Sequence, residues 1–270
     1  MDAHAFVAEV YRRMSLRHRH EQRAPAWAEI KDDPRVLQAE GELLSLLSSG
    51  LLSSDRGAAI LDVGFGGGWF LAACLRLGYG NLAGADFGIA NRRHVKEWAP
   101  DAVVLSEIKS DIGSFLAEKP ETFQFIHMSH VIEHIPKYSL LWVVDALYRA
   151  LQPGGVLMLR TPNMEGPCAN SSLYVTLAHE YGFSSGNLES LLDICGFDEI
   201  CFHPPSIAHS SFKHSSFKQT IGKFIRWPYL RASQIRHRLF GVNRHGHFDS
   251  ELIVTARRGN FAPFFDVKYR

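Results

Sequence analysis

One stretch of the chain, residues 60–70, limits the fold more than any other feature. It reads I-L-D-V-G-F-G-G-G-W-F and opens with apolar residues, as a buried parallel strand does. Glycines follow at positions 64, 66, 67 and 68, and a helix-like segment runs from Trp69 to Leu77. Glycine tolerates positive φ angles and lets a ligand lie against the backbone, where a Cβ atom would clash. Strand, glycine turn and helix in this order predict the nucleotide-cradling unit of a doubly wound α/β fold.

The spacing of the glycines indicates which nucleotide the loop is suited to bind. The dinucleotide fingerprint Gly-x-Gly-x-x-Gly, counted from Gly64, would require a third glycine where the chain has Trp69, which disfavours a nicotinamide dehydrogenase. An acid precedes the loop instead, in the pattern Asp62-x-Gly64-x-Gly66-x-Gly68. This pattern resembles the first motif of the class I S-adenosylmethionine-dependent methyltransferases. The resemblance implies S-adenosylmethionine as the cofactor, bound at Asp62, Gly64, Phe65, Gly66 and Gly68.

The second strand is expected at Asn81–Asp86, and it ends in an acid. Asp86 lies 24 positions after Asp62, near the roughly 20 residues expected of a ribose-binding acid. A carboxylate at this end of the strand can accept hydrogen bonds from both ribose hydroxyls, and Phe87 can lie against the adenine. The alternative is that Asp86 caps the helix that follows, because aspartate is a good N-cap residue.

A third strand is expected at Ala102–Leu105, and Asp111-Ile112 follows it. In the resembled family an aspartate and an apolar residue in this place meet the amino group and the ring of the adenine. The resemblance therefore assigns Asp111 and Ile112 to the cofactor site. A solvated loop acid is the alternative for Asp111.

The fourth strand, Phe123–Met128, runs into the phrase S-H-V-I-E-H-I-P at residues 129–136. This phrase resembles the segment after the fourth strand in methyltransferases of ubiquinone biosynthesis and glycan modification. The resemblance implies that Ser129 and His130 lie beside the methionine part of the cofactor. His127, His130 and His134 fall on a strand, a turn and a helix and share no face, so we expect no metal site from them.

The chain beyond residue 137 continues the resemblance. A helix is expected at Tyr138–Leu151, then a P-G-G turn, a strand at Val156–Arg160 and the residues T-P-N. In related enzymes a histidine before a later F-S turn faces the substrate, and this chain has His179 there. An imidazole can remove the proton of an oxygen acceptor near neutral pH, so His179 is the first candidate base and His130 the second. A purely structural role is the alternative for His179.

Two further strands, Asp198–Phe202 and Glu251–Arg257, complete the expected α/β fold. The resemblance implies a Rossmann-like, seven-stranded, mostly parallel sheet with helices on both faces and an antiparallel last strand. The expected regions are an N-terminal helical cap at 1–57, the S-adenosylmethionine-binding core at 58–203, a basic helical insert at 204–248, and the last core strand with a C-terminal tail at 249–270.

The charge of the chain is unevenly distributed. The net charge is +1, but the stretch from Cys201 to Phe248 holds eight lysines and arginines and no acid, which leaves −7 for the remainder. Apolar residues at 217, 221, 224 and 225 predict an amphipathic helix in it. Three interpretations of this insert stay open. It can be a lid over the substrate, a binding site for an anionic acceptor, or a peripheral contact with an anionic membrane surface through 213–240.

Several general features favour a cytoplasmic protein, with contact at the inner membrane surface as an open alternative. The four cysteines form no Cys-x-x-Cys pair, the start M-D-A-H-A-F lacks the features of a secretory signal, and no apolar run reaches the roughly 20 residues of a membrane span.

The expected activity is O-methylation of a small-molecule or sugar acceptor such as a glycan. The Asp/Asn-Pro-Pro-aromatic motif of the enzymes that methylate exocyclic amines of nucleic acids is absent after the fourth strand, so no nucleic-acid partner is expected. A quinone-like acceptor, RNA, and a non-catalytic cofactor-binding accessory protein are the alternatives.

Overall fold

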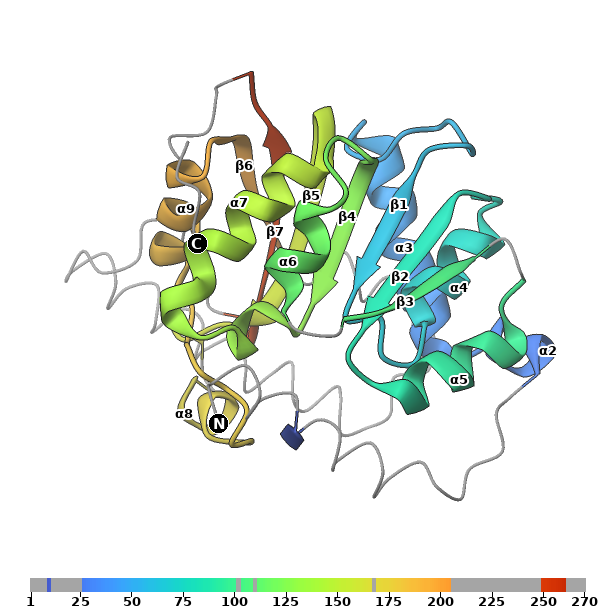
Figure 1. Cartoon of the computed structure of the whole chain (residues 1–270), viewed down its shortest axis with the longest axis horizontal. Helices are drawn as coiled ribbons and strands as arrows, with labels where there is room; N and C mark the ends of the chain where they lie inside the picture. The colour runs from blue at the N-terminus through green and yellow to red at the C-terminus, as the bar shows by residue number, and fades with distance from the viewer. Residues whose placement is uncertain are drawn as a thin grey trace, which may run out of the picture.

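The computed structural model describes residues 9–10, 26–100, 103–108, 111–166, 169–204 and 249–260. These residues form a seven-stranded sheet in the order β3-β2-β1-β4-β5-β7-β6 (Figure 1). β7 runs antiparallel to β5 and β6, and the other neighbouring strands are parallel, which confirms the expected fold class. The strands are β1 (Ile60–Val63), β2 (Leu82–Asp86), β3 (Val104–Glu107), β4 (Phe123–Ser129), β5 (Leu151–Pro162), β6 (Phe197–His203) and β7 (Glu251–Arg258).

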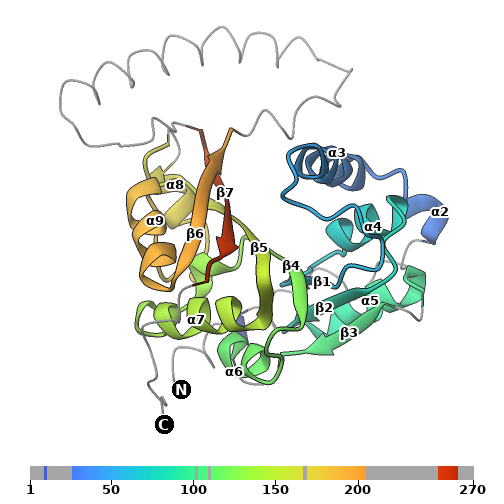
Figure 2. The same cartoon turned by 90° about the horizontal axis from the view of Figure 1, so that it is seen from above.

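Helices cover both faces of the sheet. α3, α4 and α5 pack on one face, and α6, α7 and α9 pack on the other (Figure 2). The described helices are α2 (Trp27–Ile30), α3 (Pro34–Ser48), α4 (Trp69–Arg76), α5 (Ile89–Trp98), α6 (Ile112–Ala117), α7 (Leu140–Ala150), α8 (Ala169–Leu173) and α9 (Ser185–Ile194), with 3-10 turns η1 (Ile132–His134) and η2 (Lys137–Ser139).

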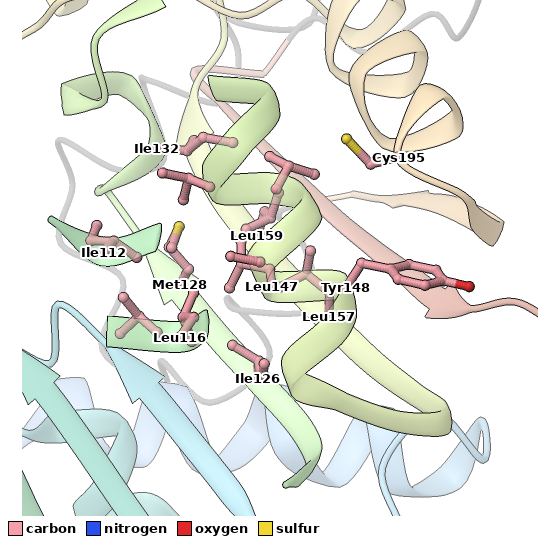
Figure 3. Close-up of a cluster of buried hydrophobic side chains, with 14 of the residues drawn as sticks. Ile112, Leu116, Ile126, Met128, Ile132, Leu147, Tyr148, Leu157, Leu159 and Cys195 are labelled. Carbon is pink, nitrogen blue, oxygen red and sulfur yellow. The ribbon is translucent and has the colours of Figure 1, made fainter. Parts of the chain in front are cut away.

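The central strands are apolar on both sides, because each side faces a layer of helices. In β1, Ile60 packs toward α3 and α4, whereas its neighbour Leu61 packs toward α6 and α7. The same alternation recurs in β5, where Met158 and Leu159 belong to opposite clusters. Figure 3 shows the hydrophobic cluster on the face of the sheet that α6 and α7 cover, where side chains of these helices meet those of β4 and β5.

Helix α3 begins at a local capping signal in the sequence. Asp33 is its N-cap residue, and its carboxylate accepts a hydrogen bond of 2.8 Å from the backbone N–H of Arg35. Pro34 occupies the first turn, where its missing N–H costs no helical hydrogen bond. α3 buries Val36, Leu43 and Leu46 and packs against α4.

Two expected elements lie at other positions. The helix expected at Tyr138–Leu151 is divided, because η2 precedes α7 and Leu151 already belongs to β5. The strand expected at Ala102–Leu105 lies further along the chain, at Val104–Glu107. The basic insert lies outside the described residues except for its first position, and so does nearly all of 1–25.

We predict that Leu147→Ala lowers the free energy of unfolding by about 2–5 kcal/mol, because it opens a cavity in the core of Figure 3. Leu147 is fully buried on α7. Leu44→Ala on α3 is the matched control: its side chain is 51% exposed, so we expect a change within about 0.5 kcal/mol. Urea unfolding followed by circular dichroism measures both, and an equal effect of the two substitutions would contradict the described packing.

Candidate functional site

A cavity of about 720 Å³ opens at the carboxyl ends of the parallel strands. It is lined by residues that directly follow β1 and β2, by the ends of β4 and β5, and by one face of α3. Open α/β sheets bind ligands at this edge. The predicted residues that line it are Asp62, Gly64, Phe65, Gly66, Asp86, Phe87, Ile112, Ser129 and His130.

The glycines of the loop after β1 serve different purposes. Gly64 has a φ of +71°, and a Cβ atom there would lie 2.3 Å from Val131 Cγ2. Gly66 has a φ of +52° and lines the cavity, and a Cβ there would meet only the Gly64 carbonyl oxygen, at 3.9 Å. Gly64 is thus explained by packing inside the protein, whereas Gly66 leaves its space to the cavity. Gly68 is the N-cap of α4 and does not line the cavity.

Asp86 joins the two loops that form the floor of the cavity. Its Oδ2 accepts a hydrogen bond of 2.9 Å from the Gly66 N–H, and its Oδ1 accepts bonds from the Gly88 N–H at 2.6 Å and Asn91 Nδ2 at 3.0 Å. A carboxylate has about four acceptor positions, so these three hydrogen bonds still allow one from a ligand hydroxyl. Gly88, not Asp86, is the N-cap of α5.

Asp62 is buried beneath the loop and is paired with a histidine of the neighbouring strand. His127 Nδ1 lies 2.7 Å from Asp62 Oδ1, because Asp62 and His127 are register partners in β1 and β4. Burial raises the pKa of Asp62, and the His127 imidazole opposes this shift. The ring of His127 stacks on Phe70 at 3.9 Å between centroids, and both rings line the cavity.

The charged end of the cavity is lined by Glu42 and Arg160, which the sequence did not indicate, and by His130, which it did; Glu251 lies beside them outside the lining. Arg160 at the end of β5 is hydrogen-bonded to Glu42 of α3, and its Nε lies 3.8 Å from Glu251 of β7. His130 lies between Glu133 Oε1 at 3.3 Å and Glu251 Oε1 at 3.1 Å. These residues come from distant segments, so only the fold brings them together.

His130 has a strained backbone and a perturbed imidazole. Its φ of +53° lies in the left-handed region, which a residue with a side chain seldom adopts. Burial would lower the pKa of His130, but the hydrogen bonds to Glu133 and Glu251 outweigh burial and raise the pKa to about 9. Near neutral pH the ring therefore carries both protons and acts as a double donor rather than as a proton acceptor.

Besides Gly68, two predicted site residues, Asp111 and His179, lie outside the cavity lining. Asp111 is the N-cap of α6, where its carboxylate accepts bonds from the Ser114 N–H at 2.8 Å and the Ser114 hydroxyl at 2.7 Å. His179 Nδ1 lies 2.7 Å from the Ser172 carbonyl oxygen. Its ring packs against His134, with 4.7 Å between the centroids.

One group of possible metal ligands stands out among the described residues. Glu133, His134 and His179 each offer a ligand atom, and these atoms lie within 4.8 Å of one another. The three histidines considered in the sequence do not form this group, since His127 and His130 are not members. Burial lowers the pKa of His134, which favours its neutral form, the form that can bind a metal.

A family model for a methyltransferase domain matches residues 35–248, so the chain belongs to this family. S-adenosylmethionine is its cofactor. The open space beside Gly66 and the carboxylate of Asp86 at the carboxyl edge of the sheet fit the adenosyl part of this cofactor. None of the helices in the described part of the chain is long and apolar enough to cross a membrane.

The chain is similar in sequence or in fold to several known proteins. A ubiquinone biosynthesis O-methyltransferase of Mesorhizobium japonicum is 32% identical over 108 residues, which span 40% of this chain and 42% of that protein. A methyltransferase structure from Archaeoglobus fulgidus has a TM-score of 0.55 at 15% identity and covers 82% of this chain and 94% of its own. A Burkholderia thailandensis 1,6-didemethyltoxoflavin-N1-methyltransferase with bound S-adenosylhomocysteine has a TM-score of 0.56 at 15% identity, over 96% and 92% of the chains.

We predict that Gly66→Ala raises the dissociation constant of S-adenosylhomocysteine at least tenfold, because the added Cβ enters the cavity. Gly78→Ala is the matched control, since Gly78 also has a positive φ of +85° and open space around it but does not line the cavity. Both substitutions strain the backbone, and only the first should weaken binding. Isothermal titration calorimetry measures the constants, and equal affinities of the two variants would refute the assignment of Gly66.

Proposed function

We propose that this protein transfers the methyl group of S-adenosylmethionine to a hydroxyl group of a small polar acceptor, with a sugar as the first choice. One observation carries the proposal: a single cavity is lined both by the glycine loop after β1 and by the charged side chains of Glu42, Arg160 and His130. The first end suits the cofactor, and the second end suits a ligand with several hydroxyls.

At the cofactor end, the cavity offers backbone groups and apolar side chains that can bind S-adenosylmethionine. When bound, S-adenosylmethionine supplies an electrophilic methyl group on its sulfonium. Asp86 would accept a ribose hydroxyl while it holds Gly66 and Gly88 in place. Phe87 and Ile112 line the cavity and would contact the adenine, and Ser129 would lie beside the methionine part. Asp62 would face the methionine part as well, with His127 orienting its carboxylate.

The charged end supports recognition of a hydroxylated acceptor, because donors and acceptors of hydrogen bonds alternate along it. Arg160 donates, whereas the carboxylate of Glu42 accepts. Charged partners hydrogen-bond more strongly than neutral ones. The network would hold the acceptor oxygen in line with the methyl group, at about 3–3.5 Å, and the enclosing α3 would limit the access of water.

The hydrogen bonds of the two candidate histidines limit which of them can act as the general base. His130 is bonded on both ring nitrogens to carboxylates, so its ring offers no lone pair to a proton and instead links Glu133 to Glu251. His179 stays a prediction as a base, and its imidazole does not line the cavity. The proton of a hydroxyl can also leave to water once the carbon–oxygen bond has begun to form.

The choice of acceptor rests on the charged lining. The relatives named for ubiquinone biosynthesis support a quinone-like phenol as the second candidate, but the match spans less than half of their length. Arg35 and Arg160 at the cavity would also favour an anionic group on the acceptor. Membrane contact through 213–240 lies outside the described residues and stays a prediction. RNA and a non-catalytic accessory role remain the alternatives.

We predict that the purified protein transfers tritium from methyl-labelled S-adenosylmethionine to a sugar acceptor, and that Glu42→Gln raises the KM for this acceptor about tenfold. The affinity for S-adenosylhomocysteine should stay within about twofold, because Glu42 belongs to the charged end. Glu40→Gln on the same helix is the control, since Glu40 pairs with Arg76 and does not line the cavity.

The assay separates the candidate functions. A panel of free sugars, sugar nucleotides and catechol-like phenols distinguishes the two acceptor classes. Labelling of phenols alone would overturn the sugar assignment, and cofactor binding without transfer to any acceptor of the panel would favour the accessory role.

A further inference from the structure

Glu133, His134 and His179 are brought together by two segments that are far apart in the sequence. The first two residues belong to η1, directly after β4, and His179 lies in the loop after α8. The backbone N–H groups of Glu180 and Tyr181 donate to the Glu133 carbonyl oxygen at 2.8 Å and 3.2 Å. These bonds fix His179 next to η1. The three side chains are therefore held by the backbone, as a metal site requires.

Both histidines are set in the same tautomer by backbone carbonyls. His134 Nδ1 lies 2.9 Å from the Ala178 carbonyl oxygen, and His179 Nδ1 lies 2.7 Å from that of Ser172. A carbonyl only accepts, so each Nδ1 carries the proton and each Nε2 carries the lone pair of the neutral ring. Metal-binding histidines show this arrangement, in which the other ring N–H donates to a carbonyl or carboxylate.

The carboxylate of Glu133 can complete such a site. It is only 2% exposed, and an ionised carboxylate is costly to bury without a partner. Its Oε2 accepts a bond of 3.1 Å from the Thr161 hydroxyl, and its Oε1 lies 3.3 Å from His130 Nδ1. A carboxylate has about four acceptor positions, so both contacts can orient Glu133 while it binds an ion.

We propose that Glu133, His134 and His179 form a site for a divalent transition-metal ion. Their ligand atoms lie within 4.8 Å of one another. Ligands at about 2.0–2.2 Å from an ion lie roughly 3–4 Å apart, so small side-chain rotations close the site. Two imidazoles and one carboxylate suit Zn²⁺, Fe²⁺ and related ions, and three protein ligands leave a coordination position open.

The open position gives the ion a role in the proposed function, on which this part of the inference rests. His134 also lines the cavity, so an ion on its ring can bind an acceptor hydroxyl there. The ion lowers the pKa of the bound hydroxyl, whose proton leaves to water. The oxygen then forms a bond to the methyl carbon, the carbon–sulfur bond breaks with its electron pair on sulfur, and S-adenosylhomocysteine is released. His179 acts in this scheme as a ligand and not as the base.

The site is tested by metal binding alone, without any acceptor. Untagged full-length protein, stripped with EDTA, is dialysed against Co²⁺ as the probe, and bound cobalt is counted by elemental analysis and by its visible absorption. We expect one ion per wild-type chain. His179→Ala and Glu133→Gln should weaken binding at least tenfold, and His94→Ala on α5, outside the group, should bind as the wild type does.

The outcomes distinguish a failure of the site from a failure of the proposed function. Binding of S-adenosylhomocysteine by each variant shows that it is folded. Absence of cobalt from the wild type, or undiminished binding by folded His179→Ala and Glu133→Gln, overturns the metal site whatever the enzyme methylates. Cobalt binding that both His179→Ala and Glu133→Gln weaken supports the site even if no hydroxyl acceptor is methylated. Loss of transfer with EDTA and its return with metal support the catalytic role, and transfer that is unaffected by EDTA overturns that role.

Discussion

The carboxylate of Asp86 is the constraint on which the cavity depends. It binds the N–H of Gly66 in the loop after β1 and the N–H of Gly88 at the start of α5. Two loops from neighbouring strands are thereby held by one buried acid, and their shape is fixed before any ligand arrives. Such preorganisation reduces the ordering cost of binding. A side chain first considered for ribose recognition is therefore also the structural link that shapes this part of the cavity.

The fold could be predicted from the sequence because its strongest features are local. An apolar strand, a glycine loop and a helix lie next to one another in the chain, and Asp33-Pro34 marks the start of α3 through capping that needs no tertiary contact. The cavity residues that follow β1, β2 and β4 were predicted for the same reason. The ends of parallel strands meet at one edge of the sheet, so a motif after each strand leads to one place.

The charged end of the cavity could not be predicted in this way. Glu42, Arg160 and Glu251 are separated by about a hundred residues from one to the next, and each alone resembles a solvated surface charge. For Asp111 the sequence did predict a role, because its motif position indicated contact with the cofactor. In the structure its carboxylate caps α6. His179 follows a motif as well, but its hydrogen bonds direct it toward Glu133 and His134. Side-chain direction, which sequence spacing does not contain, decides these cases.

The central claim is that the glycine loop and Asp86 together bind S-adenosylmethionine. Calorimetric titration of the wild type, Asp86→Ala and Asp111→Ala with S-adenosylhomocysteine tests it most directly, with NAD as the negative ligand. Asp111 is the matched aspartate, because it also accepts a backbone N–H bond but lies outside the cavity lining. We predict at least tenfold weaker binding for Asp86→Ala, about 1.4 kcal/mol, and a change within about twofold for Asp111→Ala. Unchanged affinity of folded Asp86→Ala, or equal losses in both variants, would contradict the account.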